Sequence, residues 1–138
     1  MIKVVMDTNA LIQCIASRNV YHKIWEMMLD GRFALCVSNE ILSEYAEILE
    51  RYLSPRFAEL AIDVIINCPY TLFVSPYYRF NIITEDPDDN KFVDCAVAAG
   101  VNVILTEDRH FNILNNIDFP RIKITGLNGF LDLVENIK

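Results

Sequence analysis

The sequence has few of the residues that hold small proteins together through disulfides or zinc. Only four cysteines and two histidines occur, and no cysteine pair has the CxxC spacing. These features exclude a disulfide framework and a structural zinc site. The cysteines lie in mainly apolar stretches, so we expect reduced thiols in the core. They are Cys14, Cys36, Cys68 and Cys95.

The sequence also lacks long hydrophobic runs near its start. The first apolar segment, within MIKVVMD, is only about five residues long and is closed by Asp7. Such a segment is too short to span a membrane and does not fit a signal peptide. We therefore expect a cytoplasmic protein with no membrane association.

Basic residues are in the minority, with 12 Lys and Arg against 19 Asp and Glu and a formal net charge of -7. This balance excludes a protein that holds nucleic acid mainly through a broad basic surface, because such binding depends on neutralising phosphates. The excess acid can instead be concentrated in a cation site. The 138 residues are 53% hydrophobic, enough to bury a core, and we expect one domain over residues 1–138.

Short apolar runs alternate with segments of helical periodicity along the chain. The predicted strands are continuous apolar runs, as in a parallel sheet covered on both faces. They are residues 2–6, 33–37, 71–74, 103–105 and 122–125. The predicted helices are residues 10–16, 21–29, 39–53, 57–66, 87–100 and 130–137. This alternation predicts the α/β class, with three layers, α/β/α, around a central and mainly parallel sheet.

Two aspartates directly follow predicted strands. Asp7 comes after the first strand, and Asp108 comes just past the strand at 103–105. Ligands of open α/β sheets bind beyond the carboxyl ends of the strands, so both acids are candidates for a site. Each also has a simpler interpretation, Asp7 as a helix N-cap and Asp108 as a turn residue.

The helical periodicity selects one glutamate from the segment 39–53. The apolar stripe of this helix is centred near Tyr45 and Tyr52, and Glu44 lies at its border, at about 100° per residue. The other glutamates of the helix are predicted to face water: Glu40, Glu47 and Glu50.

The helix after Pro87 selects one aspartate in the same way. Asp89 continues the apolar stripe of Phe92 and Val93, whereas Asp88 lies to one side and Asp94 points nearly opposite. A structural alternative stays open, because Asp86 before Pro87 is a natural N-cap and Asp89 stands where a capping box has its second polar residue.

Four carboxylates from separate elements favour a divalent cation, because clustered carboxylates stay ionised mainly when a cation neutralises them. Oxygen ligands with no histidine or cysteine alternative indicate Mg²⁺ or Mn²⁺ rather than zinc. Such a site suits phosphodiester hydrolysis by a metal-activated water. A serine, cysteine or histidine nucleophile is then not required, and His22 and His110 lack a partner pattern for a general base.

Four segments resemble the successive motifs of PIN domains, and the closest likeness is to the branch described as toxins of bacterial toxin–antitoxin systems. The segments are MDTNAL at 6–11, SNEILSEYAEIL at 38–49, DPDDNKFVDCAVAAG at 86–100 and ILTEDRHF at 104–111. The resemblance implies a Rossmann-like fold and an endoribonuclease that uses Mg²⁺ or Mn²⁺ to hydrolyse RNA. It also implies a small antitoxin protein as a partner and a homodimer.

The resemblance assigns the catalytic and metal-binding acids by motif. They are Asp7, Glu44, Asp89 and Asp108, with Asp86 as the alternative third acid. It implies supporting roles for Thr8 and Asn9, and for Thr106, whose hydroxyl would orient Asp108. Many members have glycine where this chain has Glu107, a residue that could bind metal, repel RNA or face water. Charged residues near the acids are candidates to contact RNA: Lys91, Arg109 and His110.

Three other functions are alternatives to a ribonuclease for this sequence. A catalytically degenerate PIN-like module would bind metal and a partner without turnover. An Asp-dependent phosphatase of the haloacid dehalogenase type needs a second aspartate two residues after the first, where this chain has Asn9. A receiver-like module needs an adjacent acidic pair after the first strand, where only Asp7 is present.

Overall fold

A computed structural model describes residues 1–16, 18–101, 103–118 and 121–136. The described strands are β1 (Ile2–Met6), β2 (Phe33–Val37), β3 (Leu72–Phe73), β4 (Val103–Leu105) and β5 (Lys123–Thr125). The described α-helices are α1 (Thr8–Ile15), α2 (His22–Leu29), α3 (Asn39–Tyr52), α4 (Pro55–Asn67), α5 (Asn90–Ala99) and α6 (Leu127–Glu135). Two 3₁₀ helices, η1 (Pro87–Asp89) and η2 (Arg109–Asn116), complete the elements of these ranges.

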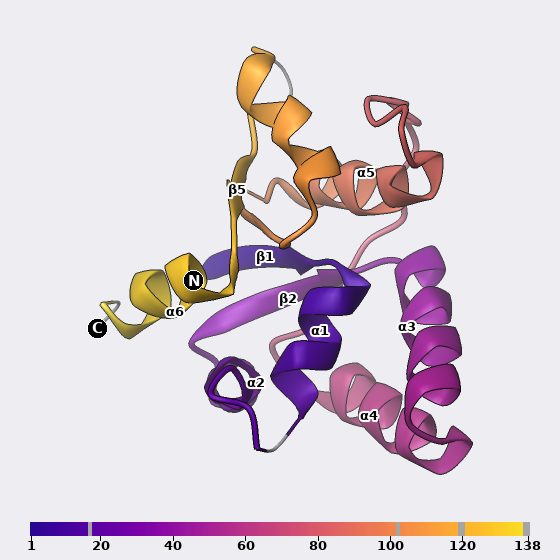
Figure 1. Cartoon of the computed structure of the whole chain (residues 1–138), viewed down its shortest axis with the longest axis vertical. Helices are drawn as coiled ribbons and strands as arrows, with labels where there is room; N and C mark the ends of the chain where they lie inside the picture. The colour runs from indigo at the N-terminus through magenta and orange to yellow at the C-terminus, as the bar shows by residue number, and fades with distance from the viewer. Residues whose placement is uncertain (17, 102, 119–120, 137–138) are drawn as a thin grey trace.

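The strands form one parallel sheet in the order β3-β2-β1-β4-β5. In the register of the central strands, Val4 of β1 is paired with Leu35 of β2 and with Val103 of β4. Figure 1 shows α5 and η2 on one side of the sheet and α1, α2 and α6 on the other. The predicted three-layer α/β fold is confirmed.

The direction of the chain changes between β1 and β4. From β1 it proceeds through β2 to β3 at one edge, and it then crosses back through α5 to β4 and β5 at the other edge. A crevice therefore opens beyond the carboxyl ends of β1 and β4, where ligands of such sheets bind. The residues that follow these two strands include Asp7 and Asp108.

The core lies between the sheet and its two helical layers. All five residues of β2 are buried, as a continuous apolar strand covered on both faces requires. On one side the ring of Phe33 packs edge-on against Phe130 of α6, with centroids 5.0 Å apart. On the other side Phe92 of α5 packs against Phe111 of η2 at 6.3 Å. The four cysteines are buried and free, as predicted.

Three local predictions were wrong. The helix η2 was not predicted, although its Phe111 and Leu114 are buried at a spacing of three residues, which is one turn of a 3₁₀ helix. The last helix begins at Leu127 rather than at residue 130, and its predicted end at residue 137 lies outside the described residues. Tyr52 does not centre a buried stripe, because its side chain is 67% exposed at the end of α3.

The described helices do not meet the requirements of a membrane span. The longest of them, α3, has 14 residues. None within the described ranges is long and apolar enough to cross a bilayer.

Candidate active site

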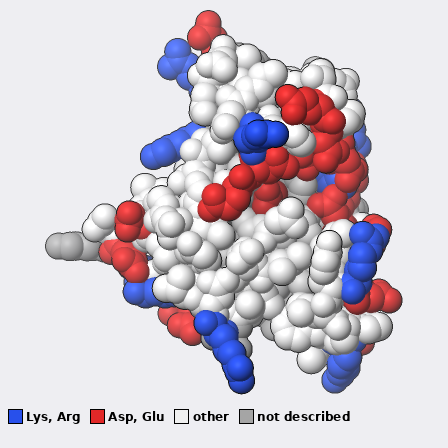
Figure 2. Space-filling view, viewed as in Figure 1, with Lys and Arg blue, Asp and Glu red and all other residues white. Residues whose placement is uncertain are grey.

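One cavity at the carboxyl edge of the sheet brings the four predicted acids together. Its volume is about 200 Å³, and carboxylates of β1, α3, η1 and the start of η2 converge on it. Figure 2 shows acidic side chains gathered in a band across this face of the molecule. The lining residues are Asp7, Thr8, Asn9, Glu44, Ile48, Tyr52, Asp86, Asp88, Asp89, Phe92 and Asp108.

Asp7 is fixed by the end of β1 and the start of α1. Its backbone N–H donates to the carbonyl of Leu105 over 3.1 Å, and its Oδ1 accepts the N–H of Ala10 over 2.8 Å. Asp7 is therefore the N-cap of α1, as predicted, and it caps the helix through one of its two carboxylate oxygens. The other oxygen, Oδ2, accepts the hydroxyl hydrogen of Thr106. Asp7 thus caps a helix and also lines the cavity.

Thr106 connects the first and last acids of the site. Its side chain is buried, its hydroxyl donates to Asp7, and its Oγ1 accepts the backbone N–H of Asp108 over 2.9 Å. One hydroxyl therefore fixes the relative positions of two carboxylates that follow neighbouring strands. The fixed arrangement reduces the reorganisation needed when a cation binds.

Burial dominates the electrostatics of Asp7. Only 5% of the residue is exposed, and desolvation raises the pKa of its carboxyl to about 6. The hydrogen bonds from Thr106 and Ala10 oppose this shift, while the charges of Asp108 and Glu44 add to it. A proton or a cation therefore stabilises this carboxylate near neutral pH.

Asp89 stands at the N-cap position of α5, but its side chain does not cap the helix. Its side chain makes no capping hydrogen bond to α5, and its buried Oδ2 has no hydrogen-bond partner among the described residues. The N-cap predicted for Asp86 is confirmed, because its Oδ1 accepts the N–H of Asp88 over 3.3 Å, but no hydrogen bond from the N–H of Asp86 to the side chain of Asp89 completes a capping box in the described part of the chain. Burial raises the pKa of Asp89 to about 7, and the charges of Asp86, Asp108, Asp7 and Glu44 contribute to the shift.

Both oxygens of Glu44 accept hydrogen bonds. Oε2 accepts the hydroxyl hydrogen of Thr8, and Oε1 accepts from Nζ of Lys91 over 2.8 Å. The same ammonium lies 3.0 Å from Oδ1 of Asp88. Burial alone would lower the pKa of Lys91, but the hydrogen bonds to Glu44 and Asp88 outweigh it and raise that pKa. Lys91 thus supplies a fixed positive charge at the edge of the cavity.

The RNA-contact candidates differ in their surroundings. Lys91 is only 12% exposed in its side chain and is held by two carboxylates. Arg109 is exposed beside Asp108. The ring of His110 lies among carboxylates, with Nδ1 3.3 Å from Oδ1 of Asp108 and 3.7 Å from Oδ2 of Asp89. A role in RNA contact stays a prediction for all three, and the surroundings of Arg109 suit it best.

Sequence reasoning missed two residues next to the four acids. It placed Asp88 to one side, yet this residue lines the cavity and pairs with Lys91. It did not select Glu85, whose Oε2 lies 3.1 Å from Nε2 of His110. Glu85 precedes the acidic run 86–89, and this proximity in the sequence was the only available signal.

Glu107 faces solvent but also has a structural role. Its Oε1 accepts the backbone N–H of Leu127 over 2.6 Å, at the first turn of α6. Gly126, the residue before this helix, has no side chain that could cap it. Glu107 therefore supplies the missing N-terminal cap and is absent from the lining of the cavity.

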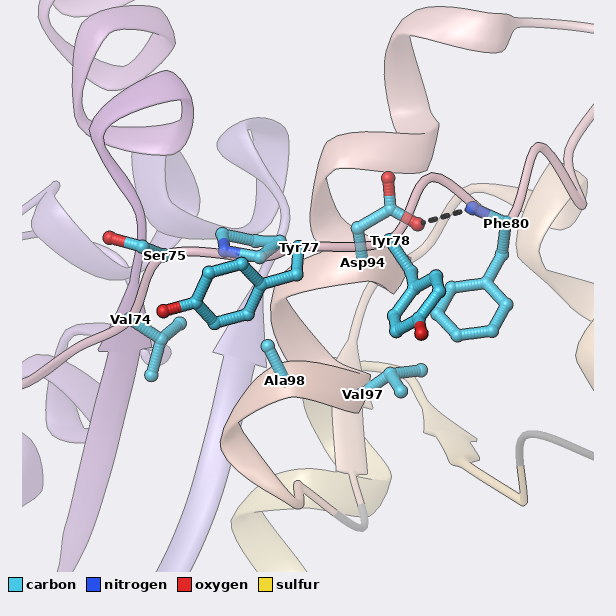
Figure 3. A pocket seen from close by; sticks show the side chains of 9 residues that line it. Val74, Ser75, Tyr77, Tyr78, Phe80, Asp94, Val97 and Ala98 are labelled. Carbon is cyan, nitrogen blue, oxygen red and sulfur yellow. Dashed lines mark hydrogen bonds between the residues drawn. The ribbon is translucent and has the colours of Figure 1, made fainter.

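Asp94 lies on the other side of α5 from the cavity, as the helical periodicity predicted. It is nevertheless only 2% exposed, because the irregular segment 75–84 passes over it. Its Oδ1 accepts the N–H of Phe80 over 3.1 Å, drawn as the dashed line in Figure 3, and Arg79 lies 3.9 Å from its Oδ2. Asp94 anchors this segment and is not among the residues that line the acidic cavity.

The hydroxyl of Tyr45 connects the helix that carries Glu44 to the strand that precedes Asp7. Tyr45 is fully buried, and its hydroxyl donates to the carbonyl of Met6. We expect Tyr45→Phe to lower the free energy of unfolding by about 1–2 kcal/mol, because a buried hydrogen bond is lost at constant shape. Denaturant unfolding measures this loss. Tyr52→Phe, at an exposed tyrosine of the same helix, is the control, and equal losses in the two variants would contradict the assignment.

The donor set of the cavity fits a hard divalent cation. Six carboxylates line it, those of Asp7, Glu44, Asp86, Asp88, Asp89 and Asp108. A buried carboxylate oxygen without a hydrogen-bond donor among the described residues, Oδ2 of Asp89, is among them. Such an oxygen is costly to bury unless a cation or a proton satisfies it. The fold and the site together define an α/β protein with a carboxylate-rich cavity at the switch point of a parallel sheet.

Comparison with known proteins identifies the family to which the chain belongs. Residues 3–110 match the PIN domain family, which covers most of the chain. The chain belongs to the PIN domain family. A comparison with curated proteins gave no significant match.

Solved structures share the fold at low sequence identity. VapBC2 from Rickettsia felis, bound to a DNA fragment from its promoter, has a TM-score of 0.62 at 14% identity, covering 91% of this chain and 98% of that chain. DNA-bound VapBC from Salmonella typhimurium has a TM-score of 0.61 at 22% identity, with 92% and 99% covered. Mycobacterium tuberculosis VapC20, described as a Sarcin-Ricin loop cleaving toxin, has a TM-score of 0.58 at 14% identity, with 79% and 92% covered.

Proposed function

We propose that the protein is an endoribonuclease that depends on Mg²⁺ or Mn²⁺ and hydrolyses RNA phosphodiester bonds. The observation that carries the proposal is the convergence of Asp7, Glu44, Asp89 and Asp108 on one cavity in a chain of the PIN domain family. These carboxylates come from four separate elements, and helix capping does not account for all of them.

The residues in and around the cavity would have different roles in the reaction. Asp7, Asp89 and Asp108 would hold the cation, and Thr106 would keep Asp7 and Asp108 in register through its two hydrogen bonds. When bound, the cation would activate a water for attack on phosphorus and stabilise the charge that develops on the phosphate. Glu44, already paired with Lys91, would contribute charge and orientation from the rim.

Two carboxyl groups of the site would exchange protons for the cation. Their raised pKa values, about 6 for Asp7 and about 7 for Asp89, leave part of them protonated near neutral pH. Cation binding would release these protons, so affinity should increase with pH between about 5 and 8. Activity is expected to increase over the same range.

We further propose that the protein is the toxin of a toxin–antitoxin pair, with a small antitoxin as its partner. The similarity in fold to VapBC proteins supports this assignment, as does the description of VapC20 as a toxin that cleaves the Sarcin-Ricin loop. A homodimer and a location in the cytoplasm belong to the same proposal. The test of the proposed pair is co-purification of this protein with a small protein that a neighbouring gene encodes.

A metal-binding module without catalysis is the second candidate. The observation that favours it is the ion pair between Lys91 and Glu44. A glutamate that is already paired with a lysine of the same chain is less available to bind a cation. Such a module would bind Mn²⁺ but would not cleave RNA at any pH. Turnover therefore separates the two candidates.

RNA cleavage that depends on a metal is the expected result for the purified protein. We expect cleavage of RNA with Mg²⁺ or Mn²⁺ and none with excess chelator, and Asp108→Asn should lower the rate at least about 100-fold because a cation ligand is lost. Asp132→Asn, at an exposed aspartate of α6, is the matched control. Wild-type protein that binds Mn²⁺ and leaves all RNA intact would overturn the nuclease, as would full activity of Asp108→Asn.

A further inference from the structure

Two buried polar atoms of the site have no hydrogen-bond partner among the described residues, and they lie near each other. They are Oδ2 of Asp89 and Nδ1 of His110, separated by 3.7 Å. The carboxylate of Asp86 joins them in a group whose ligand atoms all lie within 4.8 Å of one another. An unsatisfied oxygen beside an unsatisfied nitrogen indicates a position for a shared cation.

The other ring nitrogen of His110 indicates which tautomer is present. Nε2 lies 3.1 Å from Oε2 of Glu85, so an N–H on Nε2 can donate to this carboxylate. In that tautomer Nδ1 carries a lone pair and no hydrogen. In that tautomer Nδ1 donates no hydrogen bond to the carboxylate oxygens of Asp89 and Asp108, and its lone pair is free to bind a cation.

The spacing of the donor atoms suits one octahedral ion. Neighbouring ligands of an ion with bonds of about 2.1 Å lie roughly 3 Å apart. Nδ1 of His110 lies 3.3 Å from Oδ1 of Asp108 and 3.7 Å from Oδ2 of Asp89. Nδ1 of His110 therefore lies near ligand spacing from one oxygen of each aspartate.

The position of Glu85 is typical of a residue that supports a metal-bound histidine. Histidine ligands commonly donate their second ring N–H to a carboxylate, which fixes the ring and strengthens the nitrogen as a ligand. Glu85 is mainly exposed, with 73% of its side chain accessible. It can therefore move with the ring while its carboxylate stays beside Nε2.

We propose that His110 is a nitrogen ligand of the cation site, that Glu85 positions its ring, and that this ligand makes the site prefer Mn²⁺ to Mg²⁺. Imidazole is a good ligand for transition metals, whereas Mg²⁺ demands oxygen ligands. The inference rests on the cation site of the proposed function and adds to it a ligand that is not a carboxylate. It replaces the RNA contact predicted for this residue.

Electron paramagnetic resonance of Mn²⁺ bound to the full chain tests the proposal directly. We expect pulsed spectra to show coupling to a ¹⁴N nucleus in the wild-type protein and its loss in His110→Asn. His22→Asn is the matched control, because His22 is also a partly buried histidine, and its Nδ1 contacts the carbonyl of Cys14. The coupling should be unchanged in this control.

Calorimetric titration gives the second measurement. We expect His110→Asn to weaken Mn²⁺ binding roughly 10- to 100-fold and Mg²⁺ binding by less than about threefold. Glu85→Gln should weaken Mn²⁺ binding by a smaller factor and keep the ¹⁴N coupling, as expected for a positioning residue. Circular dichroism of each variant checks that it is folded.

The outcomes separate this inference from the proposed function. Bound Mn²⁺ without ¹⁴N coupling in the wild-type protein would overturn the nitrogen ligand and leave the nuclease standing. Nitrogen coupling without RNA cleavage would support the ligand and overturn the nuclease. Failure of the wild-type protein to bind Mn²⁺ would overturn both.

Discussion

Asp7→Asn is expected to abolish RNA cleavage and, at the same time, to make the cation-free protein more stable above pH 7. The variant loses a carboxylate that the site needs for its cation. It also removes a buried charge, because Asp7 is 5% exposed and burial raises its pKa from 3.8 to about 6. Stability and activity should therefore change in opposite directions at this position.

The sign of the stability effect follows from proton binding. Between pH 3.8 and about 6 the folded wild-type protein holds a proton on Asp7 that the unfolded chain has released. Its free energy of unfolding therefore falls as the pH rises through this window. The asparagine side chain of the variant does not titrate, so the advantage of Asp7→Asn should grow from near zero at about pH 4 to about 1–3 kcal/mol above about pH 7.

Denaturant unfolding with chelator at about pH 4, 6 and 8 measures this effect. Asp63→Asn, at an exposed aspartate of α4, is the matched control and should change stability by less than about 0.5 kcal/mol at every pH. Addition of Mg²⁺ should stabilise the wild-type protein but not Asp7→Asn. A variant that is less stable than wild type at the highest pH would contradict the role of burial, and retained cleavage would remove Asp7 from the active site.

Lys91→Met should destabilise the cation-free protein by about 1–3 kcal/mol. Methionine preserves most of the length of the side chain, but Glu44 and Asp88 lose the ammonium that lies 2.8 Å and 3.0 Å from their oxygens. Removing one partner of a largely buried ion pair leaves the remaining charge uncompensated. A divalent cation should then restore part of the loss, so saturating Mg²⁺ should stabilise this variant more than the wild-type protein.

Thermal unfolding with chelator and with Mg²⁺ checks the role of Lys91. The control is Lys23→Met, because Lys23 forms an exposed ion pair with Glu135 at 2.6 Å, and such surface pairs contribute about 0–1 kcal/mol. Equal losses in the two lysine variants would show that the pairing of Lys91 with Glu44 is no stronger than a surface ion pair.

The sequence predicted the central part of the fold well because that part depends on local signals. Strands β2 and β4 are continuous apolar runs, β1 is apolar except for Lys3, and the observed bounds of all three match the predicted ones. Helix α3 begins after a serine cap and was predicted to within one residue. The early start of α6 was missed because its cap comes from Glu107, 20 residues away in the sequence.

The candidate site was predictable to the extent that helical periodicity and strand order define positions. These signals placed Glu44 and Asp89 toward the cavity and Asp7 and Asp108 at strand ends. They could not show that Lys91 pairs with Glu44, because that contact joins residues 47 positions apart. Likewise, the apolar pattern of α3 continues to Tyr52, but it contains no information about where the core ends.

The position of His110 shows a second limit of sequence reasoning. A histidine next to Asp108 was interpreted as a candidate for RNA contact, since neither Glu85 nor Asp89 could be placed beside it from the sequence. The unpredicted helix η2 turns this ring back toward η1, which carries Asp89, and toward Glu85 in the segment before it. An error in secondary structure therefore concealed a candidate ligand.

The contact between Glu107 and the start of α6 makes two distant positions of the chain depend on each other. A Cβ atom added at Gly126 would lie 2.9 Å from Oε1 of Glu107, so a side chain at position 126 would displace this carboxylate from the N–H of Leu127. Glu107→Gly alone should therefore leave α6 without its cap, whereas a serine at position 126 should take the place of the cap from Glu107.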